Sequence, residues 1–94
     1  MAVIVIAEVH GQTEAGYDGM LSVLADLVRR ADGFVLHSAY RTEDDSWRVV
    51  EVWESEEAAR AFDEETLLPL LQSVGVDRPE GETWPVHNLV MRGG

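Results

Sequence analysis

The sequence predicts an α+β fold in which one antiparallel sheet carries helices on a single face. Residues 47–53 alternate in side-chain character as a strand does, and the residues after Ser55 place alanines and Phe62 at helical spacing. The whole chain follows the order strand, helix, strand, strand, helix, strand. This split βαβ order is typical of a sheet with helices on one face, so the other face is expected to lie bare.

Length and composition restrict the classes of protein that the chain can belong to. Ninety-four residues predict a single domain over residues 1–94, and eighteen acidic against seven basic residues give a formal net charge of -11. That charge repels phosphate groups, so neither nucleic acid nor a membrane surface is expected as a partner. The chain has no cysteine, which is compatible with a reducing cytosol. Its apolar start is short and lacks a basic leader, so we expect a strand rather than a signal peptide, and a cytoplasmic protein.

The first half of the chain is expected to form three strands and one helix. Residues 2–10 carry valine and isoleucine at both parities, which predicts a strand covered on both faces. Thr13 is expected to cap a helix whose apolar residues recur every three or four positions, and Gly33 to end it. Residues 34–41 and 47–53 then form two strands joined by a polar connection over residues 42–46.

The second half predicts two helices and a final strand. Ser55 is expected to cap the first of these helices, and Thr66 to cap a separate short helix with Pro69 in its first turn and Gly75 at its end. Residues 76–83 read as a loop and Trp84 to Met91 as the last strand. A proline within that strand predicts a position at the edge of the sheet.

The face of the sheet without helices is expected to carry a large apolar patch. Either Ile4 and Ile6 or the valines of the first strand would lie on it, with large residues from neighbouring strands. Such a patch is too large to leave in water, and a two-fold axis lets the same patch cover itself in a second copy. We therefore expect a homodimer packed sheet against sheet. The alternative is a monomer with a partly apolar exposed sheet.

Two segments resemble a known family. They are Gly33-Phe34-Val35 and the strand Trp47-x-Val49-x-Glu51-x-Trp53 followed by Ser55-Glu56-Glu57-Ala58, which resemble the antibiotic biosynthesis monooxygenase-like family of dimeric α/β-barrel proteins. The resemblance covers nearly the whole chain in element order, and the chain is also similar to short actinobacterial-type members without an assigned activity. It implies a ferredoxin-like βαββαβ protomer, a dimeric α/β barrel, and a pocket between sheet and helices. Some members oxygenate aromatic polyketides or quinols there without metal or flavin.

The chain departs from the family pattern at two positions. Phe62 stands where many members carry a histidine, which removes the usual partner of the strand glutamate. Phe62 and Gln72 also stand near the places where the haem-degrading branch has a tryptophan and its iron-ligating histidine. The resemblance therefore does not extend to haem chemistry, and we expect no cofactor.

Glu51 is the first candidate for a catalytic group. It shares a strand face with Trp47 and Trp53, and burial there would disfavour its charged form, so that it could act as a general base or acid. The alternative is a structural hydrogen bond to His37 or to backbone amides. His37 is the second candidate base, and His87 or Asn88 of the last strand is expected to polarise the substrate oxygen.

Aromatic residues are the candidates for substrate binding. Trp53, Trp47, Tyr17 and Phe62 are expected to line a pocket for a flat aromatic ligand, with ordinary core packing as the alternative. A metal site would need two of His10, His37 and His87 together with Glu8 or Glu51. We favour the interpretation in which each histidine is satisfied locally, and we expect no metal.

The function that follows is a cofactor-independent monooxygenase acting on a small aromatic polyketide or a quinol. One alternative is a non-catalytic small-molecule-binding or stress-associated barrel protein, whose pocket would hold no pair of polar groups within hydrogen-bond reach. Another is an oxygen-independent isomerase or cyclase on the same scaffold.

Overall fold

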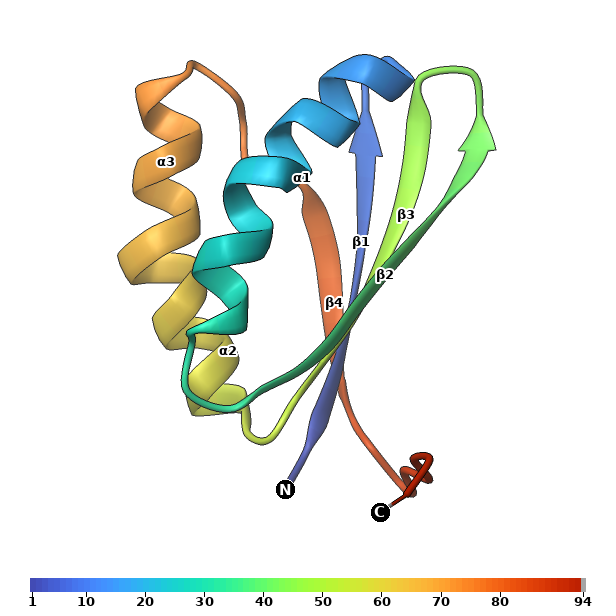
Figure 1. The fold of residues 1–94 in the computed structure, drawn as a ribbon, viewed down its shortest axis with the longest axis vertical. Coiled ribbons are helices and arrows are strands. Elements are labelled where there is room, and N and C mark those ends of the chain that lie inside the picture. The colour runs from blue at the N-terminus through green and yellow to red at the C-terminus, as the bar shows by residue number, and fades with distance from the viewer. Residues whose placement is uncertain (94) are drawn as a thin grey trace.

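A computed structural model describes residues 1–93, and Gly94, the last residue of the expected domain, lies outside the described part. Figure 1 shows a sheet with its helices on one side and both chain ends at the same end of the molecule. The elements are β1 (Val3–His10), α1 (Glu14–Arg29), β2 (Phe34–Glu43), β3 (Ser46–Trp53), α2 (Glu56–Phe62), the π-helix η1 (Asp63–Leu67), α3 (Leu68–Ser73) and β4 (Glu80–Pro85). The predicted α+β, ferredoxin-like arrangement is confirmed.

The sheet is antiparallel throughout and has the strand order β2-β3-β1-β4. β1 therefore lies inside the sheet, between β3 and β4. This position suits a strand with apolar residues on both of its faces. The register places His37 of β2 opposite Glu51 of β3, and Glu51 opposite Val5 of β1. Because side chains of directly paired residues point to the same face, His37 and Glu51 meet on the face beneath the helices.

Helix α1 begins after Thr13 as predicted, but it ends at Arg29, and Gly33 forms the turn that follows it instead of ending the helix. The Thr13 hydroxyl accepts a hydrogen bond from the Gly16 amide at 3.0 Å. Gly33 has φ 85°, and a Cβ built on it would lie 2.6 Å from the Ala58 Cβ. A glycine is therefore needed both for the left-handed turn and for the close approach to α2. The Gly33 carbonyl also accepts from the Glu54 amide at 2.7 Å, which ties the start of β2 to the end of β3.

The hairpin between β2 and β3 is tighter than the sequence predicts. Glu43 pairs with Ser46, so the two strands extend into the polar segment and leave only residues 44 and 45 as the turn. Asp45 has φ 57°, a left-handed conformation that aspartate tolerates better than most residues. The expected five-residue connection was too long because polarity alone does not prevent a residue from pairing.

The separate helix capped by Thr66 was a wrong prediction. α2, η1 and α3 form one continuous helix, and Thr66 lies inside its π-helical part. The Leu68 amide bonds to the Asp63 carbonyl, five residues earlier. Pro69 offers no N–H and would clash with a carbonyl four residues before it in an α-helix, so a wider turn just ahead of it lets the helix continue.

The last strand runs from Glu80 to Pro85 and not from Trp84 to Met91, so both its predicted bounds were wrong, and residues 80–83 of the expected loop belong to it. β4 pairs with β1 from Glu80–Glu8 to Pro85–Val3, and after that only the Val86 amide bonds to the Ala2 carbonyl. Val3 is the first residue of β1, so the pairing between the two strands ends there. β4 is an edge strand, as its proline predicts.

The core is concentrated near one end of the sheet. Val3, Val28 and Trp53 form its buried cluster, and Phe34 and Phe62 pack against it. Phe34 meets the Trp53 ring edge-on at 5.5 Å between centroids, and Phe62 meets it at 5.4 Å. Within residues 1–93, no helix has the length and apolar character needed to cross a membrane.

Candidate active site

A cavity of about 520 Å³ lies between the sheet and the helices. This volume falls in the range that small-molecule sites occupy in proteins. Most of its wall is apolar and comes from β1, β3, α1 and α2, with residues such as Val5, Val49, Leu21, Leu24 and Phe62. Gln12, Tyr17, His37 and Glu51 bring polar atoms to it. The cavity is therefore a mainly apolar chamber, with a row of polar side chains along the side formed by the sheet.

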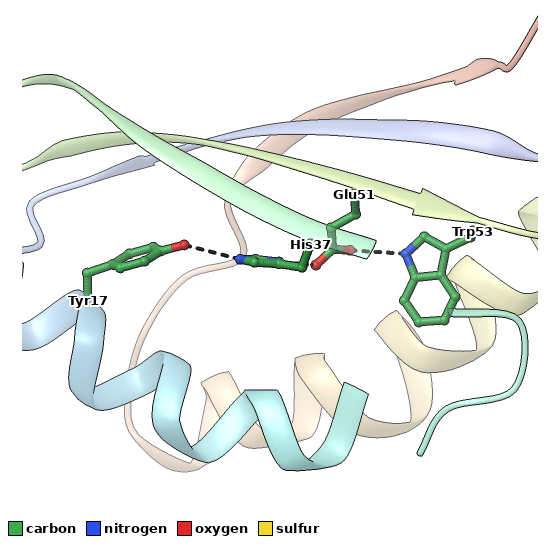
Figure 2. A network of polar contacts seen from close by, with 4 residues as sticks. All are labelled: Tyr17, His37, Glu51 and Trp53. Atoms are coloured by element: carbon green, nitrogen blue, oxygen red, sulfur yellow. Dashed lines mark hydrogen bonds and ion pairs between the residues drawn. The ribbon is translucent and has the colours of Figure 1, made fainter. Parts of the chain in front are cut away.

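The polar row is a continuous chain of hydrogen bonds through four side chains (Figure 2). His37 Nδ1 lies 2.7 Å from Glu51 Oε2, and Trp53 Nε1 donates to Glu51 Oε1 at 3.0 Å. The Tyr17 hydroxyl lies 3.2 Å from His37 Nε2. Figure 2 shows Tyr17 reaching the row from α1, whereas the other three side chains come from the sheet.

The chemistry of the donors fixes the direction of these bonds. An ionised carboxylate only accepts hydrogen bonds, so the imidazole nitrogen that faces Glu51 carries the hydrogen. The neutral His37 ring then has its lone pair on Nε2, where it accepts from the Tyr17 hydroxyl. The carboxylate on one side of the ring thus leaves Nε2 as the accepting nitrogen of His37. General acid-base catalysis can use this arrangement.

The row is shielded from water but not sealed. The side chains of His37 and Glu51 are 20% and 22% exposed, and Trp53 is 1% exposed. Desolvation raises the pKa of the Tyr17 phenol, and the nearby charges of Glu51 and Asp18 raise it further. Tyr17 therefore stays protonated at neutral pH and can donate to His37.

Tyr17 is held in place by a stack of side chains. Its ring lies on Trp47 with 4.6 Å between centroids and 15° between planes. Trp47 Nε1 donates to the Gln12 carbonyl at 2.9 Å, and the Arg41 guanidinium lies 5.1 Å from the Trp47 ring centroid. The stack joins α1 to β2 and β3 at the cavity edge, and it fixes where the phenol oxygen points.

The structure brings together five of the eight predicted site residues. His37, Glu51, Trp53, Tyr17 and Phe62 all line the cavity. Trp47 lies behind Tyr17 and is not part of the cavity wall, so it supports a lining ring and does not face the chamber. The roles assigned to these residues stay predictions.

His87 and Asn88 are not brought to the cavity. Both follow the end of β4, both are exposed, and neither lines the chamber. Their expected place depended on a strand that continues to Met91, whereas the pairing of β4 with β1 ends at Pro85 and Val3. The structure of the single chain therefore separates them from His37 and Glu51, and their polarising role stays a prediction.

The histidines do not converge on a metal site. His10 Nδ1 lies 3.1 Å from the Ser46 hydroxyl, and His37 is engaged by Glu51 and Tyr17. Over residues 1–93, no group of three or more histidine, cysteine, aspartate or glutamate side chains lies close enough to hold a metal ion. The local hydrogen bonds predicted for His10 and His37 account for these two residues.

Several cavity residues were missed from the sequence. Leu21, Leu24 and Leu71 form part of the wall, although their helical spacing is equally typical of a filled core. Arg78 belongs to the segment after α3, and it forms an ion pair with Asp63 of η1 at the cavity rim. No motif in the sequence marks this pair, because Asp63 and Arg78 are far apart in the sequence and meet only in the folded chain.

The sequence was compared with protein families and with curated proteins. Residues 2–66 match the sequence profile of the family described as antibiotic biosynthesis monooxygenase. No curated protein sequence matches the chain at a significant level.

Solved structures share the fold at low sequence identity. SnoaB, a cofactor-independent oxygenase from Streptomyces nogalater, is 20% identical, with a TM-score of 0.70 and 95% of each chain covered. Rv0793 from Mycobacterium tuberculosis is 15% identical, with a TM-score of 0.76, and 97% of this chain and 100% of that chain are covered. NE2512 from Nitrosomonas europaea, a protein of unknown function, is 16% identical, with a TM-score of 0.73 and coverage of 99% and 94%. The profile match spans well over half of the sequence, and the chain therefore belongs to the antibiotic biosynthesis monooxygenase family.

Proposed function

We propose that this protein is a cofactor-independent monooxygenase that acts on a small aromatic polyketide or quinol-type substrate inside the cavity. The observation that carries the proposal is the 2.7 Å bond between His37 Nδ1 and Glu51 Oε2 at the wall of an apolar chamber. A base oriented by a carboxylate in a mainly apolar cavity is suited to removing an acidic proton from a bound aromatic molecule.

The proposed reaction begins with proton transfer. His37 takes the acidic proton of the substrate on the Nε2 side, and Glu51 stabilises the imidazolium that forms. The substrate carbanion then reacts with dioxygen. For a tricyclic anthrone, the reacting CH₂ group and O₂ give C=O and H₂O, so one oxygen atom enters the product and the other leaves as water. The substrate itself supplies all the electrons, and the protein supplies a base and a chamber.

The polar pair favours catalysis over simple binding. A non-catalytic binding barrel was expected to have no two polar groups within hydrogen-bond reach in its pocket. His37 and Glu51 are such a pair, and the chain extends from Trp53 to Tyr17. The similarity in fold to SnoaB, described as a cofactor-independent oxygenase, also supports this proposal.

Oxygen consumption tests the proposal directly. Purified protein is mixed with anthrone in air-saturated buffer, and oxygen uptake and anthraquinone formation are followed together. We expect uptake with the wild-type protein and a loss of about 10²- to 10⁴-fold in a variant with both His37→Ala and Glu51→Gln, the range that general base catalysis supplies. Equal rates in the two proteins refute the oxygenase. Conversion of a substrate under nitrogen to a product that is not oxidised would instead identify an isomerase or cyclase.

A homodimer formed through the bare sheet face is part of the same proposal. Alternation along the strands places Ile4, Ile6, Leu36, Val50 and Trp84 on the face opposite the helices. Trp84 is 55% exposed in the single chain, which is unusual for such a large ring, and a two-fold axis would let the patch cover itself. Sedimentation equilibrium at micromolar concentration is expected to give twice the chain mass, and Ile6→Glu a single copy. A monomeric wild-type protein refutes the dimer.

We further propose that the enzyme acts in the cytoplasm, since a chain without cysteine suits a reducing compartment. Fractionation of cells that produce it is expected to recover it there, and recovery with the membranes or the medium would contradict this placement.

A further inference from the structure

We propose that Tyr17 is a catalytic residue of this site, and that its hydroxyl relays the proton of the substrate to His37. This inference rests on the proposed function, because it assigns the path by which the proposed base is reached. The argument uses the hydrogen-bond order of the row, the fixation of the Tyr17 ring and the position of its oxygen at the cavity wall.

His37 has only one nitrogen available to accept a proton. Its Nδ1 is committed to Glu51 at 2.7 Å, so Nε2 is the accepting atom. The Tyr17 oxygen lies 3.2 Å from that atom and occupies its lone pair. A proton from the cavity therefore reaches His37 either through the Tyr17 hydroxyl or after this hydroxyl has been displaced.

The packing around Tyr17 favours the first path. Its ring is stacked on Trp47 at 4.6 Å, and Trp47 is held by its bond to the Gln12 carbonyl and by Arg41 over its ring. Displacing the phenol would break this stack, whereas a relay needs no movement of the ring. A hydroxyl oxygen has two lone pairs in addition to its hydrogen, so Tyr17 can accept from a ligand while it donates to His37.

The relay is a balanced double proton transfer. The acidic proton of the substrate moves to the Tyr17 oxygen, and the former hydroxyl hydrogen of Tyr17 moves to His37 Nε2. Tyr17 ends neutral, the substrate becomes an anion, and His37 becomes an imidazolium beside the Glu51 carboxylate. Burial and the charge of Glu51 raise the pKa of Tyr17, so tyrosinate does not accumulate during the relay.

Anaerobic hydrogen exchange tests the relay without requiring oxygen chemistry. Anthrone is incubated with protein in deuterated buffer under nitrogen, and deuterium incorporation at its acidic carbon is followed by NMR. Tyr17→Phe keeps the ring on Trp47 and removes only the hydroxyl. We expect the protein-catalysed exchange rate to fall by about 10²-fold or more, with the half-saturating anthrone concentration little changed.

The chain offers a matched control. Its only other tyrosine is Tyr40, which lies on the opposite face of the sheet, where its hydroxyl is bonded to the Arg48 guanidinium at 3.1 Å. Tyr40→Phe removes a comparable hydroxyl and is expected to leave the exchange rate unchanged. In the Tyr40→Phe background, fluorinated tyrosine supplied during growth labels Tyr17 alone. The pH profile of exchange should then move to lower pH, as the acidity of the phenol increases, and this readout serves even where Tyr17→Phe does not fold.

The outcomes separate the two proposals. Exchange in Tyr17→Phe at or above the wild-type rate overturns the relay, because the substrate then reaches His37 directly. Wild-type exchange that depends on Tyr17, in a protein that consumes no oxygen, supports the relay and refutes the oxygenase. Wild-type protein that does not exceed the exchange rate of buffer overturns both.

Discussion

Replacing Glu51 by glutamine removes one negative charge and changes the side-chain volume very little. We expect this substitution to change the tautomer of His37, because the two residues are hydrogen-bonded. The Glu51 carboxylate accepts two hydrogen bonds, from His37 Nδ1 and from Trp53 Nε1. A glutamine amide has one oxygen, so it cannot accept both. The indole can only donate, whereas the imidazole can also accept. The amide oxygen should therefore face Trp53, and the amide NH₂ should donate to His37 Nδ1, which moves the imidazole hydrogen to Nε2.

The two hydrogen bonds of Glu51 determine how much the substitution should change the stability and the rate of proton abstraction. A hydrogen bond to a charged group contributes about 1.5–3 kcal/mol and a neutral one about 0.5–1.5 kcal/mol, so each of the two bonds weakens by about 1 kcal/mol. Because the carboxylate is only 22% exposed, relief of its desolvation offsets part of that loss. We expect the free energy of unfolding to fall by about 1 kcal/mol. With the Nε2 lone pair gone, proton abstraction should slow by about 10²- to 10⁴-fold.

Nitrogen NMR of the histidine ring measures the tautomer of His37. Urea unfolding measures the stability of the protein, and the rate of hydrogen exchange in anthrone measures the strength of the base. Glu8→Gln provides the matched control, since Glu8 is also a sheet carboxylate in a bonded pair, with Arg48 Nε at 2.6 Å, but on the face away from the cavity. This control should leave the His37 tautomer and the exchange rate unchanged. A Glu51→Gln protein that keeps its hydrogen on Nδ1 and exchanges anthrone at the wild-type rate would show that Glu51 does not set the base.

Three further predictions follow from packing and titration. Trp53→Phe should lower the free energy of unfolding by about 1–3 kcal/mol in urea titrations, because a smaller ring replaces a fully buried one and Glu51 loses a hydrogen-bond donor. An unchanged midpoint of unfolding would contradict this prediction. Gly33→Ala should cost at least about 1–3 kcal/mol in the same assay, because its φ of 85° is strained for alanine and the new Cβ would meet Ala58. The raised pKa of Tyr17 means that the folded state holds this proton more tightly than the unfolded state, so its contribution is complete below pH 10 and disappears as pH rises through the folded pKa. The stability difference between the wild-type protein and Tyr17→Phe should therefore shrink above pH 10.

Local patterns predicted most of the fold because each element depends on signals within a few residues. Thr13 and Ser55 cap helices as hydroxyl side chains do, with their oxygens accepting from Gly16 and Ala58. Alternation in residues 47–53 placed Glu51 on the face of Trp53, and it could be extended to the cavity because the helices cover that face. Family resemblance added the position of the chamber between the layers.

The wrong predictions have two kinds of cause: the end of β4 depends on residues distant in sequence, whereas the helix expected after Thr66 was misjudged because of a local π-turn. Residues 86–91 have the composition of a strand, but β4 stops where β1 begins, and no local pattern records the length of a partner strand. Thr66 has the composition of a cap, but the wider π-turn before Pro69 removes the need for a new helix. The bond between His37 and Glu51 was one of two options because it depends on the register between β2 and β3. The tight turn at Asp45 and the register shift between Arg41 and Glu43 set this register together.

The same register explains how Glu51 has a histidine partner although Phe62 occupies the helix position. His37 of β2 lies directly across from Glu51, and a cross-strand pair needs no helix to bring the imidazole within 2.7 Å. Phe62 is then free to pack against Trp53, whose indole holds the other carboxylate oxygen. The sheet alone thus orients the proposed base, and Tyr17 is the residue that α1 adds to the hydrogen-bonded row. Movement of the helices during substrate entry would alter the access to His37 without disturbing the pair that sets its tautomer.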